Sequence, residues 1–334
     1  MQMTWWFLRH TFHAMRQHVL SACLVSQPVY GDAMALDFDI AFDPAYGEAI
    51  PVAPGVARLT VPNPSAFTFH GTNSYIVGSD TLAIIDPGPI NDDHLRALRA
   101  VIRGRPVSHI FVSHTHVDHS PLAAVLAAET GAKVLAEGPH RPARPLRIGE
   151  INPLDASSDD DFVPDIMLKD GEVVEGDGWA LRAVFTPGHA ANHLAFGLEG
   201  TEILFSADHV MAWSTSIVAP PDGAMADFMA SLDKLLARED GLYLPGHGGP
   251  VTQPAAFVRG LKVHRKMRER AILERLRIGD RTIAEMVAAI YREVDPKLHG
   301  AAGLSVLAHL EDLVSRGQVT TENEASIDAI YIPA

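Results

Sequence analysis

The sequence predicts a mixed α/β fold in which helices cover β-sheets, followed by a smaller helical module. Between residues 56 and 250, short apolar runs of strand character alternate with segments of helical spacing. Several of these runs end in a Gly or Pro turn that carries a His or an Asp. Beyond Pro254 the pattern changes to amphipathic helical segments. The alternation predicts sheets covered by helices, and the change predicts a second module.

Composition and charge narrow the class of protein. At 334 residues the chain exceeds the usual size of one domain, so one large domain with a smaller one is expected. The hydrophobic content of 47% is ample for a buried core. A formal net charge of -14 argues against a general nucleic-acid coat protein but leaves a local basic patch open. The single cysteine, Cys23, excludes internal disulfides and thiolate metal ligands downstream.

The first part of the large domain is expected to begin with strands and then to alternate strands with helices. Strands are predicted at residues 56–61, 74–77, 82–85, 107–112 and 133–136. Helical spacing predicts helices over 92–102 and 122–129. The second helix is expected to have Ser120 as its N-cap and Pro121 at its first position.

A long segment over residues 137–165 is interrupted by several prolines and is predicted to be a loop. Loops of this length in compact domains are usually functional rims or disordered insertions, and both interpretations stay open. In the first, His140, Arg141 and Arg144 would offer positive charge to an anionic substrate.

The second part of the large domain repeats one arrangement, an apolar run that ends in a turn with a potential ligand. Strands are predicted at residues 166–168, 181–185, 194–196, 202–205 and 242–244, with a helix over 225–237. Three of the turns carry His189, Asp208 and His247. Because a shared site needs side chains at the ends of strands, the repetition predicts one site.

The densest group of potential ligands lies directly after the apolar run 107–112. Three imidazoles and a carboxylate occupy six residues: His114, His116, Asp118 and His119. A loop fixed between a strand and a helix can point these side chains at one volume. Neutral His and ionised Asp suit borderline divalent metals such as zinc. With the three later turns, this predicts a metal site with nitrogen and oxygen ligands.

The C-terminal region has the pattern of a winged-helix-like module. One helix is predicted over 257–276, and a second is expected to begin at a capping box of Thr282 and Glu285. A third is predicted from the spacing of Leu304, Leu307, Leu310 and Leu313. Wing strands are predicted at 319–321 and 329–332. Between residues 259 and 281 there are nine Lys or Arg against three acids. This basic helix is either a solvated face or a guide for an anionic substrate.

The pattern His-x-His-x-Asp-His followed by separate His, Asp and His positions resembles the metallo-β-lactamase superfamily of hydrolases over residues 56–250. With the C-terminal module and the upstream motif of residues 71–75, the chain is most similar to the β-lactamase-like protein 2 family of endoribonucleases. The resemblance implies a four-layer αββα sandwich with a C-terminal winged helix. The expected division is an N-terminal extension over 1–33, the hydrolase domain over 34–253 and the winged helix over 254–334.

The resemblance also implies a role for each ligand of a centre with two Zn²⁺ or similar divalent ions. The first ion would be held by His114, His116 and His189. The second would be held by Asp118, His119 and His247, with Asp208 bridging both. A water or hydroxide between the ions would attack the substrate, with Asp118 and Asp208 as the catalytic carboxylates.

Five further residues are candidates for the surroundings of the centre. By resemblance, Asp86 would orient the metal loop from behind. Asn73, in the upstream motif, is a candidate for support or substrate contact. His193 would support a ligand, approach the substrate or be an ordinary buried histidine. His140 and Arg141 are the candidates on the rim.

The substrate is the least determined part of the interpretation, because one metal centre serves several reactions in this superfamily. Single-stranded RNA or another phosphodiester is favoured, and a thioester of the glyoxalase II type is the alternative. A lactone, a β-lactam and a non-enzymatic DNA-binding regulator are less favoured. Asp208 occupies a position where many lactamases lack an acid, and the C-terminal module differs from the helical domain of glyoxalase II.

Residues 1–33 carry no acid before Asp32 and are expected to be a targeting segment or a start assigned too early. No apolar run reaches the ~20 residues of a membrane span. A cytoplasmic location is expected, or an organellar matrix if the segment is a transit peptide. The expected partners are a small-molecule or single-stranded RNA substrate and no membrane, and a homodimer stays open.

Overall fold

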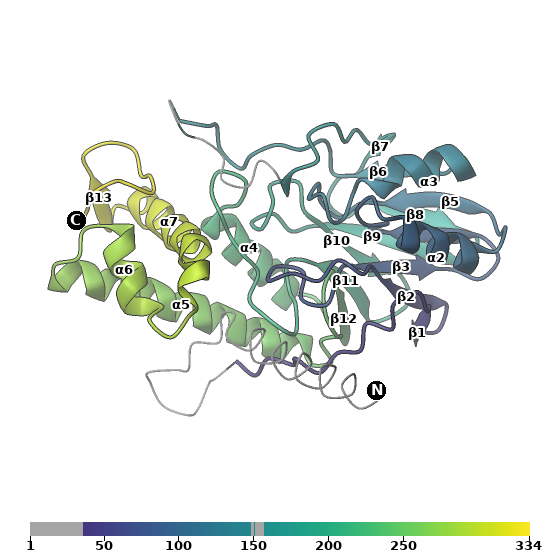
Figure 1. Ribbon diagram of the computed structural model, residues 1–334, viewed down its shortest axis with the longest axis horizontal. Helices are drawn as coiled ribbons and strands as arrows, with labels where there is room; N and C mark the ends of the chain where they lie inside the picture. Colours follow the sequence, from purple (N-terminus) through teal and green to yellow (C-terminus); the bar gives the residue numbers. More distant parts are fainter. Residues whose placement is uncertain (1–35, 148–149, 151–156) are drawn as a thin grey trace, which may run out of the picture.

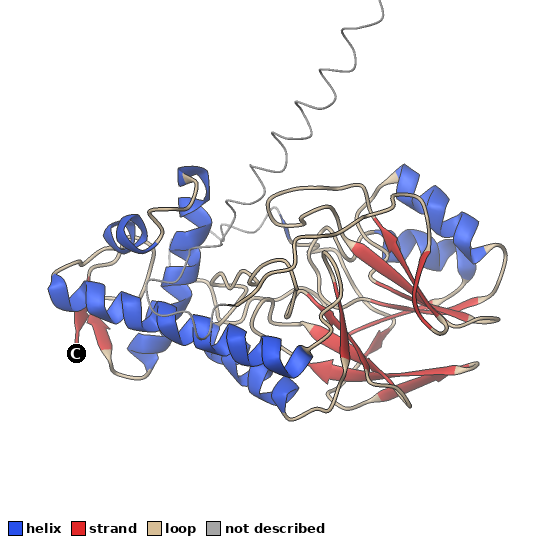
Figure 2. Cartoon of the chain, turned by 90° about the horizontal axis from the view of Figure 1, so that it is seen from below, coloured by secondary structure: helices blue, strands red, loops and turns tan. Residues whose placement is uncertain are grey.

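The computed structural model describes residues 36–147, 150 and 157–334, and the expected N-terminal extension lies outside this part. Within the described residues, a seven-stranded sheet and a five-stranded sheet form separate layers with helices on their outer sides (Figures 1 and 2). A C-terminal helical module with a two-stranded sheet follows. This arrangement confirms the predicted αββα sandwich and its winged helix.

The seven-stranded sheet contains the first strands of the chain in sequential order. Its elements, with the two helices between them, are β1 (Ile50–Ala53), β2 (Val56–Thr60), β3 (Asn73–Val77), β4 (Leu82–Ile85), α2 (Asp92–Ile102), β5 (Val107–Phe111), α3 (Leu122–Thr130), β6 (Lys133–Ala136) and β7 (Ile166–Met167). The pairs from β1 to β4 are antiparallel, and those from β4 to β7 are parallel. Helices α2 and α3 join the parallel strands β4, β5 and β6, as such crossovers require.

The five-stranded sheet is antiparallel except at one edge. Its elements are β8 (Val173–Gly176), β9 (Trp179–Phe185), β10 (Leu194–Leu198), β11 (Ile203–Ala207), α4 (Met225–Leu236) and β12 (Leu242–Pro245). The order is β12-β11-β10-β9-β8, and β12 pairs parallel to β11 after the crossover through α4.

Apolar side chains fill the space between the sheets and the space under the helices. The inner cluster joins residues of both sheets, including Phe111 and Phe196, whose ring centroids lie 5.3 Å apart. A second cluster packs α2 and α3 on the seven-stranded sheet. A third packs α4 and the start of the next helix on the five-stranded sheet. Burial on both faces explains why β4 and β10 read as continuous apolar runs.

The C-terminal module is built around one long helix. Its elements are α5 (Pro254–Ile278), α6 (Ile283–Ile290), the short 3-10 helix η2 (Pro296–Leu298), α7 (His299–Ser315), β13 (Val319–Thr321) and β14 (Tyr331–Pro333). Thr282 and Glu285 form the predicted capping box of α6. Val258 and Leu261 of α5 belong to the core under the five-stranded sheet, whereas Ile272 and Leu276 belong to the core of the module. Figure 1 shows α5 running from the sheets into the module.

Two strands were not predicted and one local expectation is wrong, each for a physical reason. Strands β1 and β8 had no prediction, because they lie at sheet edges and carry little apolar alternation. An edge position also tolerates Pro51, which lacks the N–H that an inner strand needs. Ser120 does not cap α3, since Pro121 occupies the N-cap position and the Ser120 hydroxyl donates to the Asp159 carboxylate.

The packing between the sheets gives a first prediction. Replacing Phe111 with Ala should lower the free energy of unfolding by about 3–5 kcal/mol, because the lost ring leaves a cavity among Phe196, Trp179 and their neighbours. Urea denaturation measures this change. Phe67→Ala is the control, since that side chain is 55% exposed and should change the unfolding free energy little. Equal effects of both variants would contradict this account of the core.

Candidate metal centre

The loop after β5 places its side chains against those of two later strand ends. Nδ1 of His116 lies 2.9 Å from Nε2 of His114 and 3.1 Å from Nε2 of His189. All three rings are buried. Their candidate ligand atoms lie within 4.8 Å of one another, close enough to hold one metal ion. These are the three residues that the resemblance assigned to the first ion.

A second group of donors lies beside the first. Oδ2 of Asp118 is 3.3 Å from Nε2 of His119 and 3.3 Å from Nε2 of His247. Their ligand atoms also lie within 4.8 Å of one another. The loop after β5 thus supplies Asp118 and His119, and the turn after β12 supplies His247.

Asp208, directly after β11, lies between the two groups. Its Oδ2 is 3.2 Å from Nε2 of His247 and 3.7 Å from Nε2 of His189. Its Oδ1 is 3.5 Å from Nε2 of His119. One carboxylate therefore faces a histidine of each group, which is the position that a bridging acid needs.

The donors fit a pair of divalent cations. Among the described residues, Nε2 of His119 and Oδ1 of Asp208 are buried without a hydrogen-bond partner. Buried polar atoms rarely stay unpaired, so the two atoms indicate a group that binds between them. Imidazole nitrogen with carboxylate oxygen is a donor set of zinc and similar metals.

In the metal-free protein, the histidines of the two donor groups have different protonation states. Burial lowers the pKa of His116 to about 3, and it also lowers the pKa of His189, so both rings are neutral donors. Burial also lowers the pKa of His247, but Asp208 and Asp118 outweigh this effect and raise it to about 9. The pKa of His119 is likewise raised well above its usual range against the effect of burial. Protons on these two rings therefore supply the positive charge that a metal would bring.

Asp86, directly after β4, supports the centre from behind. Its carboxylate accepts hydrogen bonds from the backbone N–H and the hydroxyl of Ser113, both at 2.7 Å. Oδ2 also lies 3.0 Å from Nδ1 of His119, which turns Nε2 toward the centre. The Asp86 backbone has a φ of 48°, an uncommon conformation that orients its side chain here.

The outer ring nitrogens of three other histidines also have oxygen partners. Nδ1 of His189 lies 2.8 Å from the Ile217 backbone oxygen. Nδ1 of His247 lies 3.2 Å from the Gly71 backbone oxygen. Nδ1 of His114 lies 2.9 Å from the Ser113 hydroxyl. Such contacts fix the tautomer and leave Nε2 free for a metal.

Two residues predicted near the centre hold its ligands. Asn73 donates to the backbone oxygens of Pro245 and Gly248, at 3.0 and 2.9 Å, and so fastens the turn that carries His247. His193 is fully buried, and its Nε2 accepts a hydrogen bond from the Asp208 backbone N–H at 3.3 Å. Of the alternatives for His193, the geometry favours support of Asp208 over contact with substrate.

Sequence reasoning missed Gly246. A Cβ at this position would lie 2.2 Å from Oδ1 of Asp208 and 2.9 Å from Cε1 of His119. Only glycine therefore lets β12 approach the centre so closely. The signal was the Pro-Gly-His-Gly turn that carries His247.

The rim cations are not available as expected. Arg141 pairs with Glu137 at 2.6 Å. Arg144 pairs at 2.7 Å with Glu150 and at 2.7 Å with Glu311 of α7. Arg141 is paired within the loop, whereas the pair of Arg144 with Glu311 ties the loop to the C-terminal module, a contact that the local sequence does not reveal.

His140 faces inward from the same loop. Its Nδ1 lies 3.1 Å from the Thr115 hydroxyl, and its Nε2 lies 3.8 Å from the buried Asp222 carboxylate. Thr115 belongs to the loop after β5, so His140 braces the metal loop from outside.

The basic helix is also less open than its composition suggests. Arg265 is buried with an exposed fraction of 4%, and it cannot belong to a solvated patch. Lys262 pairs with Asp233, and Arg275 pairs with Asp280. The exposed cations of this helix that have no ion pair within the described residues are Arg259, Lys266 and Arg270.

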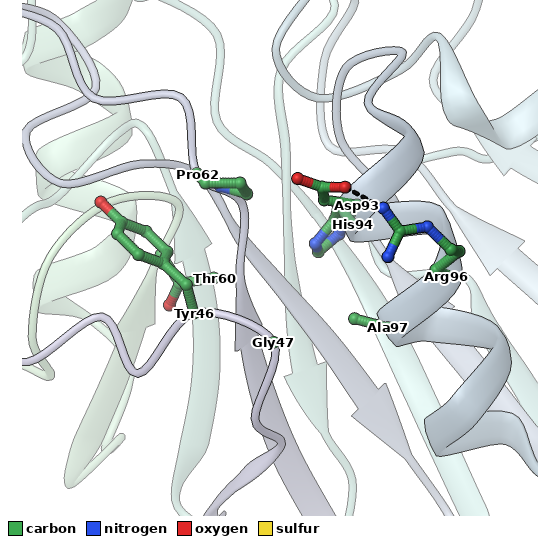
Figure 3. A pocket seen from close by; sticks show the side chains of 8 residues that line it. All are labelled: Tyr46, Gly47, Thr60, Pro62, Asp93, His94, Arg96 and Ala97. Atoms are coloured by element: carbon green, nitrogen blue, oxygen red, sulfur yellow. Dashed lines mark hydrogen bonds and ion pairs between the residues drawn. The ribbon is translucent and has the colours of Figure 1, made fainter.

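A hollow of the described surface lies away from the seven potential metal ligands. It has a volume of about 440 Å³ and is lined by Tyr46, Gly47, Thr60, Pro62, Asp93, His94, Arg96 and Ala97 (Figure 3). Asp93 and Arg96 pair with each other, and His94 lies 2.9 Å from the Ser74 hydroxyl. None of the clustered imidazoles or carboxylates lines it.

Known families match both parts of the chain. A family model described as the metallo-beta-lactamase superfamily matches residues 67–247, and one described as the beta-lactamase associated winged helix domain matches residues 282–326. The fold and the clustered donors define a hydrolase of the metal-dependent class. The chain belongs to the metallo-beta-lactamase superfamily and carries the winged helix associated with it.

Individual relatives cover most of the chain. The Drosophila melanogaster beta-lactamase-like protein 2 homolog is 30% identical over 290 residues, which is 81% of this chain and 94% of that protein. An atrochrysone carboxyl ACP thioesterase of Aspergillus novofumigatus is 26% identical over 72% of both chains. A beta-lactamase domain protein from Burkholderia ambifaria shares the fold, with a TM-score of 0.72, 22% identity and coverage of 90% of this chain and 97% of that one. No helix in the described residues is both long and apolar enough to cross a membrane.

The position of Asp86 gives a second prediction. Asp86→Asn keeps the shape of the side chain but removes the charge that orients His119, so zinc affinity should fall by about 10–100-fold. Competition with a chelating dye measures the affinity. Asp177→Asn, an exposed carboxylate in the β8–β9 turn, is the matched control. Unchanged affinity in the Asp86 variant would show that it does not orient the ligand.

A third prediction follows from the raised pKa of His247. Zinc binding at pH 7 should release protons, because His247 is protonated below about pH 9 and must lose its proton to bind. Calorimetry in buffers of different ionisation enthalpy counts the released protons. The count should fall above pH 9, and a binding heat independent of buffer at pH 7 would contradict the assignment.

The same shift has a consequence for the metal-free protein. Because the folded pKa lies above the ordinary value of 6.5, the interaction of His247 with Asp208 stabilises the fold fully below pH 6.5. This contribution is lost as the pH rises through about 9. Thermal unfolding after chelation should therefore show a midpoint that decreases between these pH values, and His247→Gln should reduce that decrease.

Proposed function

We propose that this chain is a hydrolase that uses two divalent ions, with zinc as the first candidate, to cleave a thioester or a similar acyl ester. The observation that carries the proposal is the pair of three-residue donor groups joined by Asp208. His114, His116 and His189 would hold one ion. Asp118, His119 and His247 would hold the other, and Asp208 would contact both.

The ions, when bound, would lower the pKa of a water molecule and polarise the scissile carbonyl. Asp118 is the most accessible carboxylate of the centre, with a side chain 21% exposed, and it would accept the proton that such a water loses. The Thr72 hydroxyl donates to its Oδ2 at 3.1 Å and fixes its orientation. His114 and His119 of the same centre are buried.

Three features favour an acyl substrate over an anionic polymer. The rim arginines are neutralised by carboxylates, and the chain has a net charge of -14. Val117, within the metal loop, is 37% exposed. Phe67 is 55% exposed at the tip of a turn closed by Ser65 and Phe69, in the segment that leads to Thr72 beside Asp118. Exposed apolar side chains in the metal loop and in the segment before Thr72 suit an acyl chain.

Relatives provide a further argument for this substrate. Proteins of Aspergillus novofumigatus and Paecilomyces divaricatus that are 26% identical to this chain are named atrochrysone carboxyl ACP thioesterases. Thioester hydrolysis was the alternative in the sequence interpretation. The paired rim cations and buried Arg265 are the reasons for preferring it here.

A phosphodiester such as single-stranded RNA is the second candidate. Arg259, Lys266 and Arg270 on α5 are exposed and offer positive charge. The chain is also 30% identical to a beta-lactamase-like protein 2 homolog. Because the sequence resembles the endoribonucleases of that family, this identity also favours a phosphodiester substrate. The two candidates differ in their response to salt and to these three residues.

A paired assay distinguishes the candidates. Acyl thioesters of different chain length should be hydrolysed, and single-stranded RNA should stay intact. A chelator should stop the reaction and zinc should restore it. Asp208→Ala should lower kcat by at least about 10²-fold, the scale of losing a group that stabilises the transition state. RNA cleavage without thioester hydrolysis would reverse the order of the candidates.

The exposed side chain of Phe67 allows a finer test. Phe67→Ser should raise KM for long-chain thioesters and leave acetyl thioesters unchanged, because it removes apolar contact with the chain. Ile90→Ser, at a side chain 66% exposed, is the control. If RNA is the substrate instead, replacing Arg259, Lys266 and Arg270 with Gln should reduce the salt slope of binding, by about one per lost phosphate contact.

A further inference from the structure

One charged side chain of α5 lies buried behind the metal centre. Arg265 is 4% exposed and donates a hydrogen bond from its guanidinium to the Ser216 backbone oxygen. The guanidinium carbon lies 5.0 Å from the ring centroid of Phe228 in α4. No carboxylate within the described part of the chain pairs with it.

The residue that Arg265 contacts belongs to the segment of residues 208–217. The Ser216 hydroxyl donates to the backbone oxygen of Asp208 and, at 3.0 Å, to that of His209. The neighbouring Ile217 backbone oxygen lies 2.8 Å from Nδ1 of His189. The 208–217 segment therefore fixes the backbone of the central carboxylate and the ring of a histidine ligand.

We propose that Arg265 is a positioning residue through which the C-terminal module sets the geometry of the metal centre. It acts on Ser216, and Ser216 acts on Asp208 and, through Ile217, on His189. The inference rests on the proposed metal centre, because it assigns these two residues as ligands. It gives the winged helix a role in the reaction that needs no contact with substrate.

The cost of burying this charge supports the assignment. Taking a guanidinium out of water without a carboxylate partner is unfavourable, and an apolar residue would fill the same space at lower cost. Burial lowers the pKa of Arg265 to about 10, so it still carries its charge at neutral pH. Burial lowers the pKa of the neighbouring His309 to about 3, so its ring is neutral.

The planar guanidinium explains why arginine is used. Its fixed fork can donate to Ser216 while its face lies over the ring of Phe228, a combination that the compact ammonium of lysine does not reproduce. The charge also strengthens the bond to the carbonyl oxygen, since a charged donor binds more strongly than a neutral one.

Arg268 provides a matched control on the same helix. Its guanidinium carbon lies 4.7 Å from the ring centroid of Tyr291, so it also packs on an aromatic ring. That ring belongs to the module and not to the 208–217 segment. Arg265→Met and Arg268→Met thus remove similar side chains, and only the first removes the bond to Ser216.

Zinc titration of the full-length chain tests the proposal. Arg265→Met should lower the affinity for at least one zinc ion by about 10–100-fold, the usual effect of losing an outer partner of a ligand. Arg268→Met should leave the affinity unchanged. Thermal unfolding of both metal-free variants shows whether they fold equally well. Equal zinc affinity in the parent and in Arg265→Met would overturn the proposal.

Ser216→Ala adds a test that a purely structural role would not pass. It removes the hydroxyl bond to Asp208 and keeps the backbone oxygen that Arg265 contacts. Its loss of zinc affinity should not add to that of Arg265→Met, because both act along one path. Fully additive losses would contradict the path. If Arg265→Met does not fold, Ser216→Ala alone tests the proposal. Zinc affinity equal to that of the parent in Ser216→Ala would then reject the positioning role of Arg265.

The two proposals fail in different ways. A parent protein that binds no zinc or similar ion would reject the proposed function. A parent that binds two ions, with an Arg265→Met variant that binds them equally well, would reject only the positioning role.

Discussion

Two carboxylates packed among five imidazoles impose the constraint on which the hydrolase domain depends. Asp118 and Asp208 have pKa values well below the usual range although burial opposes their ionisation, because His119 and His247 supply positive charge. A site of this kind needs either protons or metal ions to stay neutral. The surrounding strands, turns and outer hydrogen bonds hold the donors in positions where either protons or metal ions can balance their charge.

The sandwich meets this constraint by bringing strand ends together. The metal loop follows β5, Asp86 follows β4, and Asp208 and His247 follow β11 and β12. The inner apolar cluster aligns the sheets that carry these ends. Gly246 then allows the last strand to approach within the reach of Asp208. Core packing therefore determines the distances between the ligand side chains, because it fixes the strand ends that carry them.

Local patterns predicted much of this structure, and long-range contacts account for the rest. The metal loop was visible because its ligands are adjacent in sequence, and the recurring turns identified His189, Asp208 and His247. The burial of Arg265 and the pairing of Arg144 with Glu311 were not predictable, because each depends on a partner far along the chain. A charge count along α5 cannot distinguish a solvated arginine from one enclosed between two domains.

Helix α5 has a consequence for how such proteins vary and how they are divided. One end of the helix completes the outer layer of the sandwich, and the other end forms a wall of the module. Truncation before Pro254 would expose the apolar surface that α5 covers on the five-stranded sheet. Truncation after Ile278 would keep the part of α5 that belongs to the core of the module but remove the rest of that core. Exchange of C-terminal modules between relatives therefore requires a junction inside the helix, between Leu261 and Ile272, where one core ends and the other begins. The two modules therefore share one helix, each packing on a different part of it.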